Sequence, residues 1–111
     1  MEVTTTQFKH CDVVAPKGRI DSFTAPELAK SIDAILNDGR YKIVLDMAGV
    51  DYMSSAGLRV LISTQKNCKR YNRGEVILAE VPRRIYEALD LAGFVPLFRF
   101  FDDSTAAVGH F

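Results

Sequence analysis

The sequence predicts a single α/β domain over residues 1–111, with helices packed on a mixed, mostly parallel sheet of about four to five strands. Two observations support this fold class. Short segments rich in β-branched residues alternate with segments of helical periodicity, as in chains whose strands are joined by helical crossovers. The run from Tyr41 to Met47 is apolar except for Lys42 and Asp46, as expected of a central strand covered on both faces. The predicted order of elements is ββαβαβαβα.

The chain is predicted to begin with a strand pair. Segments 3–8 and 13–15 are strand candidates, and Pro16-Lys17-Gly18 has the composition of a turn. A helix is predicted to follow, because Thr24 and Glu27 have capping-box spacing and precede an apolar helical pattern.

The remaining elements follow from the same periodicities. They are a helix over about 55–72, a strand over 75–79, a helix over 82–92, a strand over 97–101 and a short final helix. The helix at 55–72 has one apolar side, whereas the opposite side carries Arg59, Lys66 and Arg70 and is predicted to face solvent. Such a basic side either steers an acidic partner or is simply solvated.

Composition excludes several classes of protein. Lysines and arginines number 14 and aspartates and glutamates also 14, so the basic excess of a nucleic-acid binder is missing. Cys11 and Cys68 are isolated, which predicts buried thiols instead of a zinc site or a disulfide. We expect neither a signal peptide nor a membrane-spanning segment, because the N-terminal residues lack a charged region followed by an apolar region and no apolar run is long enough to span a bilayer. We therefore expect a cytoplasmic protein that neither binds nucleic acid directly nor inserts into a membrane.

Enzymatic interpretations find little support. Around Ser55 the chain reads Met53-Ser-Ser-Ala-Gly57, which lacks the first glycine of a nucleophile elbow, and neither histidine is placed to act as its base. No dinucleotide fingerprint, P-loop or metal-ligand spacing occurs. We expect no enzymatic activity, no cofactor and no metal.

Ser54 and Ser55 stand where the central strand leads through a short loop into the next helix. Backbone N–H groups at a helix N-terminus favour negative charge, so a phosphate attached here would be tolerated. The alternative is that one of these serines is only an N-cap. Asp46, at the end of the central strand, is expected to accept hydrogen bonds from loop amides, since the acidic cluster and lysine of a receiver domain are not recognisable.

Three segments resemble a known family. They are Gly18-Arg-Ile-Asp21 followed by Thr24-Ala-Pro-Glu-Leu28, then Ile43-Val-Leu-Asp46, then Val50-Asp-Tyr-Met-Ser-Ser-Ala-Gly-Leu58. In this order and at these distances they are similar to the STAS domains of bacterial anti-sigma factor antagonists, and the resemblance covers nearly the whole chain. It implies the fold already predicted from periodicity.

The resemblance also implies a phosphorylation site. The family motif reads Asp-Ser-Ser/Thr/Ala-Gly-Leu and is phosphorylated on the serine after the aspartate. Here Ser54 takes the place of the aspartate and Ser55 that of the phosphoacceptor, followed by Ala56-Gly57-Leu58. We expect phosphorylation at Ser55 and, less favoured because of the departure at Ser54, at Ser54 itself.

A partner-binding surface is expected around Ser55. Asp21 matches an acidic family position near the phosphoacceptor, although a turn-capping role fits it as well. Tyr52 and Met53 are expected either as exposed apolar contacts or as core residues. The expected partner-binding residues are Asp21, Ser22, Thr24, Tyr52, Met53, Ser54, Ala56, Gly57 and Arg59.

The family's mechanism is partner switching. The unmodified protein binds an anti-sigma factor that is also a serine kinase and so frees the sigma factor, phosphorylation reverses this, and a serine/threonine phosphatase resets it. The alternative is a non-switching STAS adaptor or scaffold, in a signalling complex or with a transporter, in which Ser55 is merely a cap. The two differ in whether charge at Ser55 changes partner binding.

Overall fold

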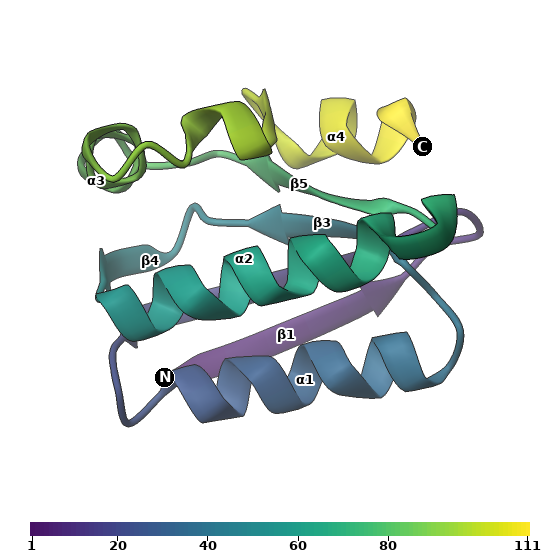
Figure 1. Ribbon diagram of the computed structural model, residues 1–111, viewed down its shortest axis with the longest axis horizontal. Helices are drawn as coiled ribbons and strands as arrows, with labels where there is room; N and C mark the ends of the chain where they lie inside the picture. The colour runs from purple at the N-terminus through teal and green to yellow at the C-terminus, as the bar shows by residue number, and fades with distance from the viewer.

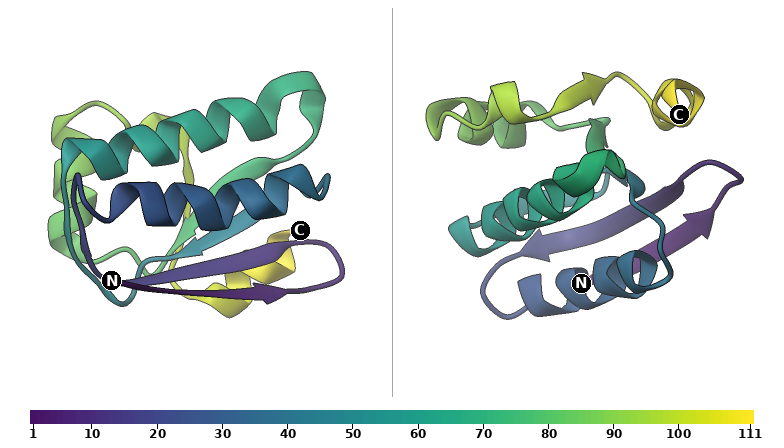
Figure 2. Two further views of the ribbon diagram at one scale, coloured as in Figure 1. Left: turned by 90° about the horizontal axis from the view of Figure 1, so that it is seen from below. Right: turned by 45° about the vertical axis from the view of Figure 1, so that its right-hand side comes forward.

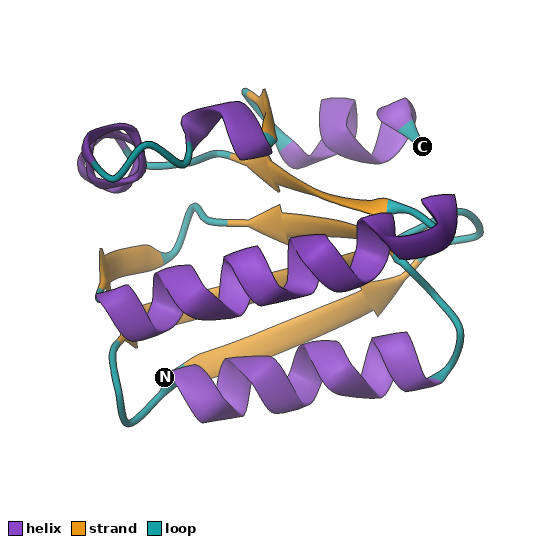
Figure 3. Ribbon diagram, in the orientation of Figure 1, coloured by secondary structure: helices purple, strands orange, loops and turns teal.

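The computed structural model describes all 111 residues and contains six strands and four α-helices (Figures 1 and 3). The strands are β1 (Glu2–Gln7), β2 (Asp12–Ile20), β3 (Lys42–Asp46), β4 (Val50–Met53), β5 (Glu75–Ala79) and β6 (Arg99–Phe101). The α-helices are α1 (Ala25–Asn37), α2 (Ser55–Lys69), α3 (Arg83–Leu91) and α4 (Ser104–His110), with short 3-10 turns η1 (Arg70–Asn72) and η2 (Val95–Leu97).

The strands form one mixed sheet in the order β1-β2-β3-β5-β6, with β4 also pairing β2. Only β1 is antiparallel to its neighbour, whereas β2–β3, β2–β4, β3–β5 and β5–β6 are parallel. The predicted fold class is therefore confirmed, and β3 is central as expected.

Strand β4 was missed by the sequence analysis, which placed a loop there and counted four to five strands. Strands β3 and β4 follow one another along the same side of β2, joined by a turn at 47–49. In that turn the Asp46 carboxylate accepts a hydrogen bond from the Ala48 N–H at 3.1 Å, which confirms the role expected for Asp46. Four residues between a turn and a helix are too few to show a clear strand period.

The predicted turn at Pro16-Lys17-Gly18 is wrong, because β2 runs through it without interruption. The glycine and proline mark an irregularity within the strand. Gly18 has a φ of +105°, and the register of the β2–β4 ladder shifts between Gly18 and Arg19. Pro16 lies between the residues that pair with β3 and those that pair with β4, where its missing N–H breaks no parallel ladder.

Helices cover both faces of the sheet (Figure 2). Helices α1 and α2 lie on one face, where Leu28, Ile32 and Leu61 join Ile43 and Leu45 in the main core. The opposite face holds a smaller cluster beneath α4, which consists of Cys11, Val44, Ile77, Ala79 and Ala107. Along β3 and along β5, consecutive side chains thus point alternately into the main core and into the smaller cluster. Both faces of these strands are buried, which explains their continuous apolar sequence.

The two cysteines are free and buried, as expected. Burial raises the pKa of the Cys68 thiol to about 11, and Arg73 lowers it only in part. Burial and the Asp12 carboxylate raise the pKa of Cys11, against an opposing effect of Arg40. Both thiols therefore act as small apolar side chains.

Gly57 packs the first turn of α2 closely onto the sheet. A Cβ at this position would lie 2.7 Å from Ile20 Cγ2 and 2.8 Å from Met53 Cγ. We predict that Gly57→Ala lowers the free energy of unfolding by about 1–3 kcal/mol through overpacking, despite the better helix propensity of alanine.

The control is Gly109→Ala in α4, where a Cβ would meet nothing within 4 Å. This variant should leave stability unchanged or slightly raised in urea denaturation. Equal effects of the two substitutions would contradict the close packing at Gly57.

Candidate functional site

The site is built where the carboxyl ends of β2 and β4 meet the N-terminus of α2. Arg19 pairs with Tyr52 and Ile20 with Met53 in the parallel ladder. The Ser54 N–H then donates to the Ile20 carbonyl oxygen at 2.8 Å, so the backbone pairing extends into the loop before α2. The turn that leads from β2 into α1 and the first turn of α2 therefore lie side by side, as Figure 1 shows.

The two serines have different roles. Ser54 is the N-cap of α2, with extended backbone angles and an Oγ that accepts the Ala56 N–H at 3.2 Å. Ser55 is the first residue of the helix, is exposed, and its hydroxyl makes no hydrogen bond within the protein. The capping role thus belongs to Ser54, and the Ser55 hydroxyl is available for chemistry.

Ser54 stands where the family motif has aspartate. Serine and aspartate are both strong N-caps, so the substitution keeps the cap of α2 and removes one negative charge. The first turn of α2 contains no acidic residue. An anion on Ser55 would therefore meet the positive end of the helix without a carboxylate in the same helical turn.

Asp21 organises the turn before α1. Its Oδ1 accepts the N–H groups of Phe23 at 3.0 Å and Thr24 at 3.2 Å, and its Oδ2 lies 3.4 Å from Arg19 Nε. These hydrogen bonds, led by that of the Thr24 N–H, lower the pKa of Asp21 below its usual value. The turn-capping alternative is confirmed, and the carboxylate also remains partly open to a partner.

Thr24 does not form the predicted capping box with Glu27. Its hydroxyl instead donates to the Arg19 carbonyl oxygen at 2.7 Å and accepts the Asp21 N–H at 2.8 Å. Thr24 is still the N-cap residue of α1 by position, but no side-chain hydrogen bond caps the helix. The Thr24 side chain thus connects the turn to β2 through the hydrogen bond to the Arg19 carbonyl oxygen.

Exposed apolar side chains lie beside these polar groups. Tyr52 is 43% exposed, and the Arg19 guanidinium lies 4.2 Å from its ring centroid. Phe23 is 91% exposed, although it lies within the turn that Asp21 organises. Sequence reasoning missed Phe23 and Arg19 as site residues. Phe23 could have been recognised from the sequence, because it is an aromatic residue in a polar turn and does not belong to the apolar pattern of a helix or strand.

The other expected partner-binding residues divide by burial. Ser22 and Arg59 are exposed, and Arg59 lies one helical turn after Ser55 without an ion pair. Ala56 is half-buried. Met53 is only 7% exposed and takes the core alternative, and Gly57 is also buried. Met53 and Gly57 therefore pack beneath the surface around Ser55 and are not part of it.

Groups of three or more histidine, cysteine, aspartate or glutamate side chains that could hold a metal do not occur. None of the helices is both long and apolar enough to span a bilayer.

The comparisons with known proteins agree with this geometry. The family model for the STAS domain matches residues 2–107, so the chain belongs to the STAS domain family. BtrV of Bordetella bronchiseptica, named as an anti-sigma factor antagonist of unproven status, is 29% identical over 111 residues, which is all of this chain and 95% of BtrV. The anti-sigma-B factor antagonist of Staphylococcus aureus is 32% identical over 94 residues, covering 85% of each chain.

Solved structures share the fold. The anti-sigma factor antagonist SpoIIAA of Bacillus in its unphosphorylated form superposes with a TM-score of 0.83 at 14% identity, over 98% of this chain and 95% of that one. The phosphorylated form of SpoIIAA gives a TM-score of 0.77 at 13% identity, over 98% of both chains. The relatives by sequence named above are anti-sigma factor antagonists, and the fold is shared with SpoIIAA and also with a sulfate transporter family protein of Wolinella succinogenes, at a TM-score of 0.79 and 20% identity over 95% of this chain and 87% of that one.

The different roles of Ser54 and Ser55 can be tested by measuring the stability of variants. We predict that Ser54→Ala lowers the free energy of unfolding by about 0.5–2 kcal/mol, because the Ala56 N–H loses its acceptor. Ser55→Ala should change it by less than about 0.5 kcal/mol, because that hydroxyl has no partner. Chemical denaturation of both variants checks this, and a larger loss for Ser55→Ala would refute the assignment of the cap.

Proposed function

We propose that the protein is an anti-sigma factor antagonist that works by partner switching. The unphosphorylated form binds an anti-sigma factor that is also a serine kinase, and so frees the sigma factor. Phosphorylation of Ser55 blocks this binding, and a serine/threonine phosphatase restores it. The observation that carries the proposal is the exposed, unbonded Ser55 hydroxyl at the start of α2, next to a helix cap already supplied by Ser54.

The surface around Ser55 suits a protein partner. Exposed Tyr52 and Phe23 supply aromatic contacts of the kind that anchor interfaces, and Arg19 and Asp21 supply charge next to them. The proposed partner contacts are the accessible members of the expected set, namely Asp21, Ser22, Thr24, Tyr52, Ser54, Ala56 and Arg59, together with Phe23 and Arg19.

The phosphorylation step requires a free hydroxyl. Ser55 Oγ attacks the γ-phosphorus of ATP, ADP leaves, and the hydroxyl proton passes to a base of the kinase. The phosphatase later hydrolyses the ester and returns the serine and inorganic phosphate. Ser54 is the weaker acceptor, because phosphorylation there would alter the hydroxyl that caps α2.

The phosphate acts on the complex and leaves the fold intact. Phosphoserine adds about −1.5 to −2 charges at neutral pH. On the free protein this charge meets the N–H groups and the dipole of α2, and Arg59 one turn on is available to pair with it. In the complex the same charge would be held in a desolvated interface with a kinase site, where like charges are costly. The role is that of a binding module rather than a catalyst, acting in the cytoplasm.

A pull-down tests the proposal. We predict that wild type and Ser55→Ala recover a kinase-fold anti-sigma factor from lysate of the source cell in the presence of magnesium and ADP. Ser55→Asp should recover at least tenfold less, because it places an anion in the contact surface. Mass spectrometry identifies and quantifies the partner.

The matched control is Ser63→Asp, which adds the same charge at an exposed position farther along α2 and should bind as wild type does. Equal recovery by all four proteins would contradict the switch. Recovery of a transporter or scaffold alone, unaffected by Ser55→Asp, would support the adaptor alternative.

A further inference from the structure

A basic cavity lies at the end of the molecule opposite Ser55. It has a volume of about 210 Å³ and is formed by the loop between β1 and β2, the connection from α1 to β3, and the segment after η1. Its basic lining residues are Lys9, His10, Arg40, Lys42 and Arg73, whereas the one acidic lining residue is Asp12. The overall charge balance of the chain thus conceals a local excess of positive charge.

Arg40 is fixed in the wall of this cavity. Its Nε donates to Asp12 Oδ1, and its Nη2 donates to the carbonyl oxygens of Phe8 and Cys11. The Asp12 side chain is only 7% exposed, so the single acidic group of the cavity is already engaged in an ion pair. Nη1 of Arg40 has no partner within the protein.

Arg73 is held in the same manner. Its Nε donates to the Arg70 carbonyl oxygen at 3.0 Å, and its Nη2 donates to the carbonyl and side-chain oxygens of Asn67 at 2.7 and 2.8 Å. The guanidinium also stacks 3.9 Å from the ring centroid of Tyr41. Again Nη1 is left without a partner, so two immobilised guanidinium groups of one cavity each retain unused N–H donors.

Lys9 and Lys42 complete the basic lining. Both are exposed, and neither takes part in an ion pair. Basic residues near helix C-termini often do no more than offset the helix dipole, and α1 and α2 both end nearby. The dipole places about half a negative charge at the C-terminus of each helix. The positive charge of the two free ammonium groups and two guanidinium groups exceeds the negative charge at the two helix ends.

We propose that this cavity binds a phosphate-class oxyanion, either free phosphate or pyrophosphate or the phosphate group of a lipid headgroup. Fixed guanidinium groups with free N–H donors match the geometry of phosphate oxygens, and the lysines add charge. The volume is below the 300–1,000 Å³ typical of pockets for drug-sized ligands, which favours a phosphate group over a whole nucleotide.

This site is independent of the switch at Ser55. Helix α2 has 15 residues, so the two ends of the helix lie about 22 Å apart. The cavity lies beyond the C-terminal end, where Arg73 follows η1, and Ser55 begins the N-terminal end. The inference therefore goes beyond the proposed function.

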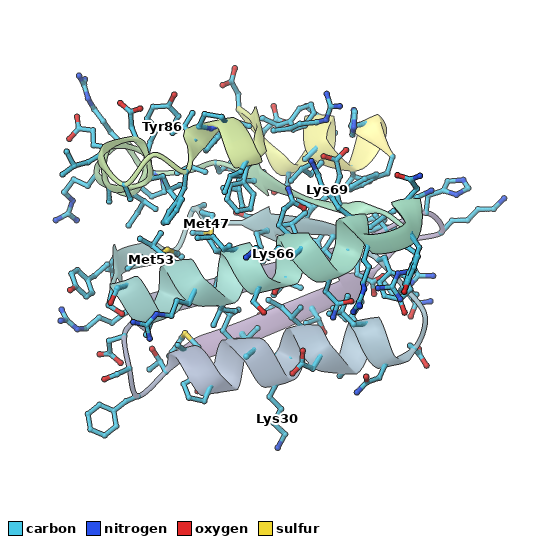
Figure 4. All side chains as sticks on the ribbon, in the orientation of Figure 1. Lys30, Met47, Met53, Lys66, Lys69 and Tyr86 are labelled. Atoms are coloured by element: carbon cyan, nitrogen blue, oxygen red, sulfur yellow. The ribbon has the colours of Figure 1, made fainter.

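Calorimetric titration with sodium pyrophosphate at low ionic strength tests the proposal. Wild type should bind, and the double variant Lys9→Gln/Lys42→Gln should bind about tenfold more weakly, because two unpaired charges are lost. The control Lys17→Gln/Lys30→Gln removes two exposed charges outside the cavity and should bind as wild type does; Figure 4 shows Lys30 extending away from α1. Ser55→Asp should also bind pyrophosphate normally, which keeps this test separate from the switch.

A second experiment distinguishes a free phosphate or pyrophosphate from the phosphate group of a lipid headgroup. Cosedimentation with phosphatidylcholine vesicles that contain phosphatidic acid reports a lipid headgroup, whereas pyrophosphate binding alone reports a free anion. Binding to either probe supports the proposal if the Lys9→Gln/Lys42→Gln variant binds more weakly than wild type and the Lys17→Gln/Lys30→Gln control does not. Absence of binding to both probes, or equal binding by both double variants, would overturn it.

Discussion

The pairing of β2 with β4 is the interaction on which the site depends. This parallel ladder, extended by the hydrogen bond from the Ser54 N–H to the Ile20 carbonyl oxygen, fixes where α2 begins. It also places the turn organised by Asp21 beside the first turn of that helix. Because Gly57 allows α2 to approach Ile20 and Met53 closely, the N-terminus of the helix is held against the sheet from below. Backbone pairing and close packing therefore fix the position of the α2 N-terminus that carries Ser55.

A helix N-terminus held in place by packing is a suitable position for a reversible charge. The cap of α2 is made by Ser54, so chemistry at Ser55 leaves the cap in place. The unsatisfied N–H groups of the first turn and the helix dipole favour an added anion on the free protein. The same anion is unfavourable inside a desolvated interface. We therefore propose that phosphorylation of Ser55 changes partner binding far more than folding, on a surface that also exposes Tyr52 and Phe23.

Much of the fold followed from sequence, and the exceptions share a cause. The continuous apolar runs of β3 and β5 predicted buried parallel strands because both of their faces enter cores. Strand β4 and the course of β2 through Pro16 and Gly18 depend on pairing between distant segments, which local turn signals cannot reveal. The same holds at the site. The motif predicted Ser55 as the phosphoacceptor. Only the three-dimensional arrangement showed that Ser54 caps α2, that Met53 is buried and that Phe23 is exposed.

The central claim is that charge on Ser55 acts on the complex and leaves the fold intact. It is tested most directly by the thermal unfolding midpoint of protein phosphorylated stoichiometrically at Ser55, measured beside the unmodified protein in the same buffer. The account predicts a midpoint that is unchanged or raised by a few degrees, roughly as expected for an anion at a helix N-terminus. A midpoint lowered by several degrees would mean that the phosphate disrupts α2, and it would contradict the account.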